Sequence, residues 1–288
     1  MAYGDPNYNG PSAWSGGSRR HNIGAGLIIG ILMAGFALCK YYSTSQVNDV
    51  TGEKQHITIT PEQEIAIGLQ SSPEMIQQYG GLHPDENGQK LVKEVGQRLV
   101  KNSSAKDTPY QYDFHLLADA DVVNAFALPG GQVFITAALF NKLENQDQLA
   151  GVLGHEIGHV VARHGAERIA QMELSQGLTG AAVIASGDYK TAQAAQMIAN
   201  LVNMSYGRNQ ESKADNLGVR FMTETGYNPE AMIGVMQILE KSGSGQSQPE
   251  FLSTHPSPEN RIEKIKEAII QYKDLAPATP VAPSTPVK

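Results

Sequence analysis

The pentapeptide His155-Glu156-Ile157-Gly158-His159 constrains this chain more than any other feature. Residues four positions apart lie on one face of an α-helix, so both imidazole rings can reach a single metal ion at about 2.0–2.1 Å. Glu156 lies about 100° further around the helix, beside the ion, where its carboxylate can act as a general base toward an attacking water. The pentapeptide therefore predicts the metal centre of a peptidase, and the surrounding sequence has to support it.

The flanking residues place the pentapeptide in the middle of a helix. Asn145 followed by Gln148 has the form of a capping box, and an apolar face follows it, made of Leu149, Val152, Leu153, Ile157, Val160 and Val161. Gly151, Gly154 and Gly158 would each cost a helix about 1 kcal/mol relative to alanine. We therefore expect a buried active-site helix that another backbone or a ligand approaches closely.

Composition limits the class of protein and the choice of ligands. The 288 residues, 41% of them apolar, can form one large domain or two small ones. A net charge of −7 without a Lys/Arg-rich stripe argues against a nucleic-acid partner. The single cysteine, Cys39, permits neither an intramolecular disulfide nor a zinc site built from thiolates. Histidine, aspartate and glutamate remain as the possible metal ligands.

An uncharged segment near the N-terminus predicts a membrane anchor. Seventeen positions from Ile23 to Cys39 carry no charge, and they follow Arg19 and Arg20 and precede Lys40. We expect a transmembrane helix over residues 23–42, with a cleaved signal peptide as the alternative. The bias of positive charge predicts a cytoplasmic N-terminus and a single-pass protein whose catalytic domain is extracytoplasmic, periplasmic in a Gram-negative cell. If the segment is cleaved, the domain is exported.

The rest of the chain divides by composition into a tail, a linker, one domain and a second tail. Residues 1–22 predict a disordered tail, 43–59 a polar linker and 274–288 a Pro-rich tail. The domain, residues 60–273, opens with a capping box at Thr60. Alternation from Tyr112 to Leu116, and two strand-like runs around Pro129-Gly130-Gly131, predict a small sheet beside the metal helix. The predicted fold is α+β and mostly helical. The apolar stretch from Gly177 to Ile198 is expected to be either a buried helix pair or a segment that touches the membrane.

A catalytic zinc ion usually has three protein ligands, so a third must come from elsewhere in the chain. Glu211 and Asp215 are the best candidates, because they share one face of a helix expected over residues 208–223. One carboxylate can bind the metal, and the other can accept the free N–H of a ligand histidine. Two acids at this spacing are more often a solvated face, and the upstream motif is what favours a site.

Four motifs in order extend this pattern: Asn124 to Gly131, His155 to Val160, Glu211-x-x-Ala214-Asp215 and Ser253-Thr254-His255-Pro256. From about Thr60 to Ile270 the chain resembles the zinc metallopeptidases related to HtpX, BepA and the CaaX prenyl proteases. The resemblance implies a zincin-like domain that binds one Zn²⁺ per chain through His155, His159 and Glu211. It also implies Glu156 as the general base and Asp215 as the support of a ligand histidine.

The single clear span makes the chain more similar to the BepA-like periplasmic quality-control branch than to the multi-span prenyl proteases. This resemblance implies misfolded or membrane-associated polypeptides as substrates. A membrane-tethered chaperone or adaptor with a closed or non-catalytic zinc site is the alternative.

The resemblance also suggests how a substrate is held. The strand Asn124, Ala125, Phe126, Ala127 and Leu128 would border the cleft, where an exposed edge can pair with an extended polypeptide. His255 would face the metal, either as a hydrogen-bond donor to the developing oxyanion or as a reversible ligand at the open coordination position. Tyr206 is a further candidate for the oxyanion donor.

Overall fold

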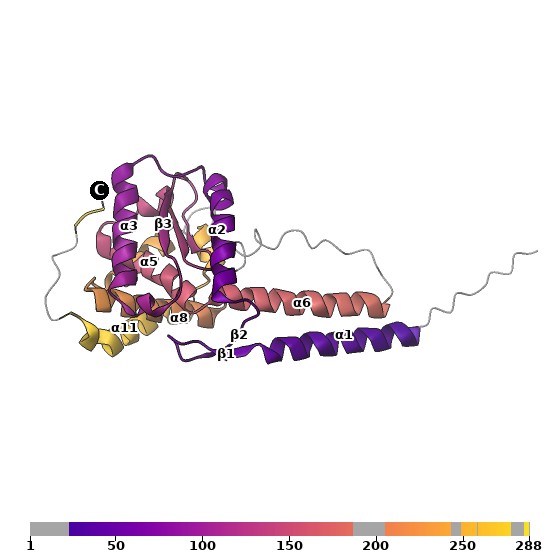
Figure 1. Ribbon diagram of the computed structural model, residues 1–288. Coiled ribbons are helices and arrows are strands. Elements are labelled where there is room, and N and C mark those ends of the chain that lie inside the picture. The colour runs from indigo at the N-terminus through magenta and orange to yellow at the C-terminus, as the bar shows by residue number, and fades with distance from the viewer. Residues whose placement is uncertain (1–22, 187–204, 243–248, 258, 278–284, 288) are drawn as a thin grey trace, which may run out of the picture.

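A computed structural model describes residues 23–186, 205–242, 249–257, 259–277 and 285–287 (Figure 1). The predicted disordered tail, residues 1–22, lies outside the described residues. The fold is mostly helical with two small sheets, and this confirms the predicted class. The helices are α1 (Ile23–Ser43), α2 (Pro61–Gln78), α3 (Glu86–Lys101), α4 (Ala137–Phe140), α5 (Gln146–Val161), α6 (His164–Ser186), α8 (Arg208–Thr225), α9 (Ala231–Ser242), α10 (Glu250–Thr254) and α11 (Arg261–Tyr272), with 3₁₀ turns η1 (Ser104–Asp107) and η2 (Lys273–Leu275).

The central sheet has three strands in the order β3 (Asp113–Leu117), β5 (Gln132–Thr136) and β4 (Ala125–Ala127). β3 runs parallel to β5, whereas β4 pairs antiparallel with β5 and forms one edge of the sheet. The predicted hairpin between β4 and β5 is confirmed. Its turn requires glycine, because Gly130 has φ 82° and a Cβ there would lie 2.4 Å from the Cα of Ile65 in α2.

Helix α5, which carries the pentapeptide, is buried along nearly its whole length in the core of the domain. The side chain of Asn145 caps its start by accepting a hydrogen bond from the backbone N–H of Gln148 at 3.0 Å. Two of the three glycines of α5 face α8: a Cβ at Gly158 would lie 2.8 Å from the carbonyl oxygen of Ala214, and one at Gly154 would lie 3.4 Å from the Cα of Gly218. Gly151 instead faces α9, where a Cβ would lie 3.5 Å from the Cα of Met232. The predicted close approach is thus confirmed, and the neighbour of Gly154 and Gly158 is the helix that carries Glu211.

Helices α1 and α6 lie side by side and extend together away from the domain (Figure 1). Within the described residues, one helical segment, Ala25–Ser43 in α1, is long and apolar enough to cross a membrane. Its large apolar side chains are exposed, with Leu32 at 68% and Phe36 at 72%. Only the beginning of the Gly177–Ile198 stretch is described, as part of α6, where Leu178 is 37% exposed and Ala181 is buried. Residues 187–204 lie outside the described residues, so the buried helix pair stays a prediction.

Two segments expected to be extended chain make specific contacts with the ends of α5. Residues 43–59, predicted as a linker, contain the antiparallel strands β1 (Ser45–Val47) and β2 (Lys54–His56). The amide of Asn48 donates to the carbonyl of Val161 at 2.9 Å, where α5 ends. From the C-terminal tail, the carbonyl of Thr285 accepts from the N–H of Gln146 at 3.1 Å, where α5 begins. Strands of three residues are too short to produce a periodic pattern in the sequence.

Candidate metal centre

Helices α5 and α8 bring three potential ligands together in the core. His155 and His159 point from α5 toward Glu211 on α8, and all three are at most 2% exposed. The Nε2 atoms of the two histidines are 3.0 Å apart, and each lies 3.4 Å from one carboxylate oxygen of Glu211. Close packing of α5 on α8 at Gly154 and Gly158 makes this approach possible.

These separations match those of a tetrahedral metal site. Atoms bound at about 2.0–2.1 Å at tetrahedral angles lie roughly 3.4 Å apart. The ligand atoms of His155, His159, Glu211 and His255 all lie within 4.8 Å of one another. Glu211 Oε2 is buried without a hydrogen-bond partner among the described residues, although Nη2 of Arg261 lies 3.5 Å from it, and a bound metal ion would satisfy this oxygen directly. Burial would raise the pKa of Glu211, but the surrounding histidines lower it well below its usual value, so the group is a carboxylate. The cluster could therefore hold a metal ion.

Asp215 holds His155 in place from the side opposite the cluster. Its carboxylate lies 2.8 Å from His155 Nδ1, which leaves Nε2 directed at Glu211. Arg261, at the start of α11, donates to both oxygens of Asp215 at 2.7 and 2.8 Å. Burial would lower the pKa of His155, but the contacts with Asp215 and Glu211 raise it to about 10. Sequence reasoning placed Asp215 beside a histidine but missed Arg261, whose only signal is its position six residues after His255.

His164 does for His159 what Asp215 does for His155. The Nδ1 atoms of the two rings are 2.8 Å apart, and His164 is fully buried. Burial lowers the pKa of His164 to about 3, so its ring is neutral. If Nδ1 of His159 donates this hydrogen bond, its Nε2 lone pair is free for a metal and His164 is the acceptor. The sequence offered no role for His164, because it is the first residue of a different helix, beyond a residue in the left-handed conformation, Arg163.

Replacing His164 by alanine should weaken metal binding about 10–100-fold, the usual cost of removing the partner of a ligand histidine. Glutamine at the same position keeps a neutral acceptor and should restore most of the affinity. Competition with a chromogenic zinc chelator measures both variants against the parent. Equal affinity in the parent and the alanine variant, with unfolding temperatures alike, would show that His164 only fills space.

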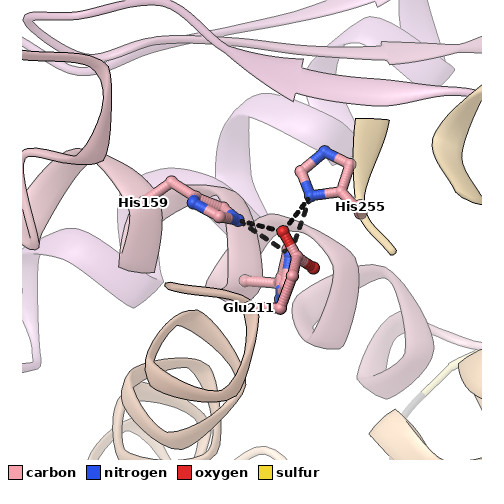
Figure 2. A group of neighbouring side chains, drawn as sticks. His159, Glu211 and His255 are labelled. Carbon is pink, nitrogen blue, oxygen red and sulfur yellow. Dashed lines mark hydrogen bonds and ion pairs between the residues drawn. The ribbon is translucent and has the colours of Figure 1, made fainter. Parts of the chain in front are cut away.

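Glu156 and His255 complete the cluster. Glu156 is fully buried, burial raises its pKa, and its Oε1 lies 3.7 Å from Nε2 of His255. Nδ1 of His255 lies 3.1 Å from Glu211 Oε1 and 3.2 Å from His155 Nε2. Figure 2 shows His159 and His255 converging on the carboxylate of Glu211. His255 therefore occupies the fourth corner of the ligand set, at the C-terminal end of α10.

Tyr206 and Arg168 form a stack beside the cluster. The ring of Tyr206 lies on that of His159 with centroids 3.7 Å apart, and the guanidinium carbon of Arg168 lies 3.3 Å from the Tyr206 centroid. Burial raises the pKa of Tyr206 to about 12, so the phenol keeps its proton. The backbone N–H of Tyr206 donates to the carbonyl of Thr254 at 2.8 Å, which ties this residue to the helix that carries His255. The predicted candidate therefore lies in the site.

The edge strand borders the same place. Thr136 N–H donates to the carbonyl of Asn124, and Leu128 N–H donates to that of Gln132, so these residues face β5. The N–H and C=O groups of Ala125 and Ala127 therefore point away from β5. Ala127, Tyr206 and His255 all line one pocket of about 20 Å³, room for about one water molecule. The edge, the stack and the metal cluster thus meet in one narrow cleft, which must widen to admit a polypeptide.

Two histidines and a glutamate around a potential metal position, with a second glutamate beside them, define a metallopeptidase centre. The family model described as peptidase family M48 matches residues 86–269. The chain belongs to this family.

Several curated proteins are similar to the chain. It is 32% identical over 192 residues to a protein of Yersinia pestis named beta-barrel assembly-enhancing protease. The aligned residues cover 63% of this chain and 39% of that protein. It is 28% identical over 247 residues to the mitochondrial metalloendopeptidase OMA1 of Schizosaccharomyces pombe, covering 83% of the chain and 71% of the relative. The human mitochondrial metalloendopeptidase OMA1 is 29% identical over 265 residues, which cover 85% of the chain and 50% of that protein. The chain thus spans well under half the length of the first of these relatives.

Proposed function

We propose that the chain is a membrane-anchored zinc-dependent metalloendopeptidase that cleaves misfolded or membrane-associated polypeptides. The buried cluster of His155, His159 and Glu211 supports this proposal, together with Glu156 beside it, whose carboxylate has no hydrogen-bond partner among the described residues. The names of the relatives, a beta-barrel assembly-enhancing protease and a mitochondrial metalloendopeptidase, support a role in protein quality control. Zinc suits the donor set of two imidazoles and one carboxylate with no thiolate.

In the proposed mechanism Glu156 is the general base. When bound, zinc supplies the Lewis acidity that polarises the scissile carbonyl and makes water nucleophilic near neutral pH. Glu156 accepts a proton from the attacking water and then passes it to the leaving amine. Its raised pKa suits both steps, because a base whose pKa lies nearer neutrality also gives the proton back readily. The protonated phenol of Tyr206 would donate a hydrogen bond to the developing oxyanion.

His255 is proposed to act as a reversible latch. Its Nδ1 lies at the fourth corner of the ligand set, where it would exclude a substrate carbonyl or water. The other possibility, an oxyanion donor, requires α10 to move so that the ring leaves this corner. Because Thr254 also binds the backbone of Tyr206, movement of α10 would carry Tyr206 with it and open the cleft. Under this proposal His255→Ala leaves the zinc ligands in place and exposes the open position.

An extended substrate is proposed to pair with the outward edge of β4. Proline at position 127 removes only an N–H that points away from β5, a position that a sheet tolerates. Ala127→Pro should therefore raise KM for an unfolded protein substrate several-fold with little change in zinc content. Ala127→Val, which keeps the N–H, is the matched control, and steady-state kinetics on both variants tests the edge. Identical KM values in the two variants would contradict pairing at this strand.

The membrane anchor is proposed to be α1. Its exposed apolar surface and the candidate span Ala25–Ser43 support insertion in a bilayer. The extracytoplasmic placement of the domain, periplasmic in a Gram-negative cell, follows from the charge bias around the segment. Polypeptides are the proposed partners, together with the membrane.

A tethered chaperone or adaptor is the second candidate, and the position of His255 favours it. With His255 bound, the metal would have four protein ligands, as structural zinc sites do. Incubation of the purified protein with denatured casein, with and without chelator, separates the two functions. Chelator-sensitive fragments in the parent, and in His255→Ala, support the peptidase; an intact substrate in both, with stoichiometric zinc, supports the chaperone.

A further inference from the structure

A groove of about 420 Å³ runs between α1 and α6, remote from the metal cluster. It is lined by small residues, among them Ala37, Ala170 and Gly177, and by large apolar ones, among them Leu32, Phe36 and Leu174. A Cβ at Gly177 would lie 2.9 Å from that of Ala37, so the two helices are in close contact there. The groove exists because the two helices are in contact through small residues.

One end of the groove is polar. Lys40 Nζ lies 2.9 Å from Glu173 Oε2, and Thr58 Oγ1 donates to Glu173 Oε1 at 3.3 Å. The lysine side chain remains 55% exposed, so solvent or a ligand can reach it. The groove therefore has the polarity of an amphiphile: apolar along its length, with one exposed cation and one anion at its mouth.

The part of α1 that lines the groove is about as long as one leaflet of a bilayer is thick. From Ile29 to Lys40 the helix rises roughly 16 Å, about half of a hydrocarbon core of about 30 Å. Lys40 and Tyr41 mark the interfacial end of the span. Beyond Glu173, the α6 residues Leu174 to Ser186 carry no charge and run back along α1 (Figure 1). A lipid at the mouth would thus have its tail beside both helices.

We infer that this groove binds one acyl chain of a membrane phospholipid, with the phosphate at Lys40. The inference rests on the proposed insertion of α1 in the membrane. Water is a poor occupant of an apolar groove, whereas an acyl chain buries its surface against both helices. The Lys40–Glu173 pair complements a zwitterionic headgroup, whose phosphate and ammonium carry the opposite charges. Because α6 begins at His164, which contacts His159, the lipid-binding helix is continuous with the metal centre.

The test uses the full chain in phosphatidylethanolamine vesicles that contain a phosphatidylethanolamine with a photoactivatable acyl chain. Peptide mass spectrometry should find adducts on α1 and also on α6 near Leu174. As the fraction of photoactivatable lipid in the vesicles rises, labelling of α6 should reach a plateau, because a single site is filled. Labelling of the outward face of α1 should instead increase in proportion to that fraction. Ala37→Phe places a large side chain in the groove and should abolish most of the α6 labelling. Gly35→Phe is the matched control, since a side chain at Gly35 meets nothing within 4 Å.

Two outcomes would overturn the inference. The first is the presence of adducts on α1 without adducts on α6. The second is α6 labelling that does not saturate and is equal in Ala37→Phe and Gly35→Phe. Either result would show that the probe contacts the helices as bulk lipid and not in a binding site. Flotation of the vesicles, followed by carbonate extraction, tests the anchor separately. Loss of the protein from the floated fraction contradicts membrane insertion itself, whereas retention without saturable α6 labelling contradicts only the groove.

Discussion

Replacing Glu156 by glutamine is expected to slow peptide hydrolysis about 10²–10⁴-fold while zinc binding is retained. The amide has the same shape as the carboxylate but cannot take a proton from water. Because Glu156 is not among the four residues whose ligand atoms lie within 4.8 Å of one another, its loss should leave the zinc content near one ion per chain. The measurements are kcat/KM on denatured casein and elemental analysis of the same samples.

A remote glutamate provides the control for this substitution. Glu94 lies on α3 with its side chain 62% exposed, so Glu94→Gln removes the same charge without touching the site. It should cleave casein at the parental rate. If Glu156→Gln cleaved casein as fast as the parent, Glu156 could not be the general base.

Glu156→Gln should also stabilise the zinc-free protein. Burial raises the folded-state pKa of Glu156 above its unfolded value, so the folded state binds the proton more tightly. Between the two pKa values the unfolded chain loses this proton while the folded protein keeps it. The free energy of unfolding of the parent therefore falls as pH rises from the unfolded pKa toward the folded pKa. Glutamine does not ionise, so thermal unfolding near pH 7 should move to a higher temperature, with the gain vanishing below about pH 4.

Replacing Glu211 by glutamine is expected to abolish both zinc binding and hydrolysis. The carboxylate is the only anionic member of the ligand set and faces three imidazoles, so its charge is the main attraction for a dication. The loss of affinity should exceed the roughly 10–100-fold expected for His164→Ala, because a direct ligand is removed. Zinc content after dialysis and chelator competition measure the effect.

The two glutamate variants should differ in how they respond to added metal. Excess zinc should restore part of the activity of Glu211→Gln, because two histidines remain, but none of that of Glu156→Gln. Asp215→Asn is the intermediate case, since it keeps all three ligands and weakens the hold on His155. Full zinc occupancy in dialysed Glu211→Gln would show that the carboxylate is not a ligand.

Local patterns in the sequence predicted much of the fold. The spacing of His155 and His159 and the cap at Asn145 depend only on residues that are close in the sequence. The glycines of α5 indicate a close approach of another element, because they lack a side chain. The hairpin at Gly130 was predictable for the same reason, because only glycine adopts its backbone conformation at that point. The segment 43–59 was not, since its strands are held by α5 and not by a pattern of their own.

The sequence alone determined which residues can supply the chemistry: two imidazoles on one helical face, a glutamate beside them, and a pair of acidic residues on a later helix. Only the tertiary structure decided how they are held. Arg261 reaches Asp215, His164 reaches His159, and His255 takes the fourth corner through contacts between helices that are far apart along the chain. Such contacts depend on how the helices pack. The close approach of α5 and α8 at Gly154 and Gly218, for example, sets distances between side chains that the hydrophobic periodicity of the sequence does not contain.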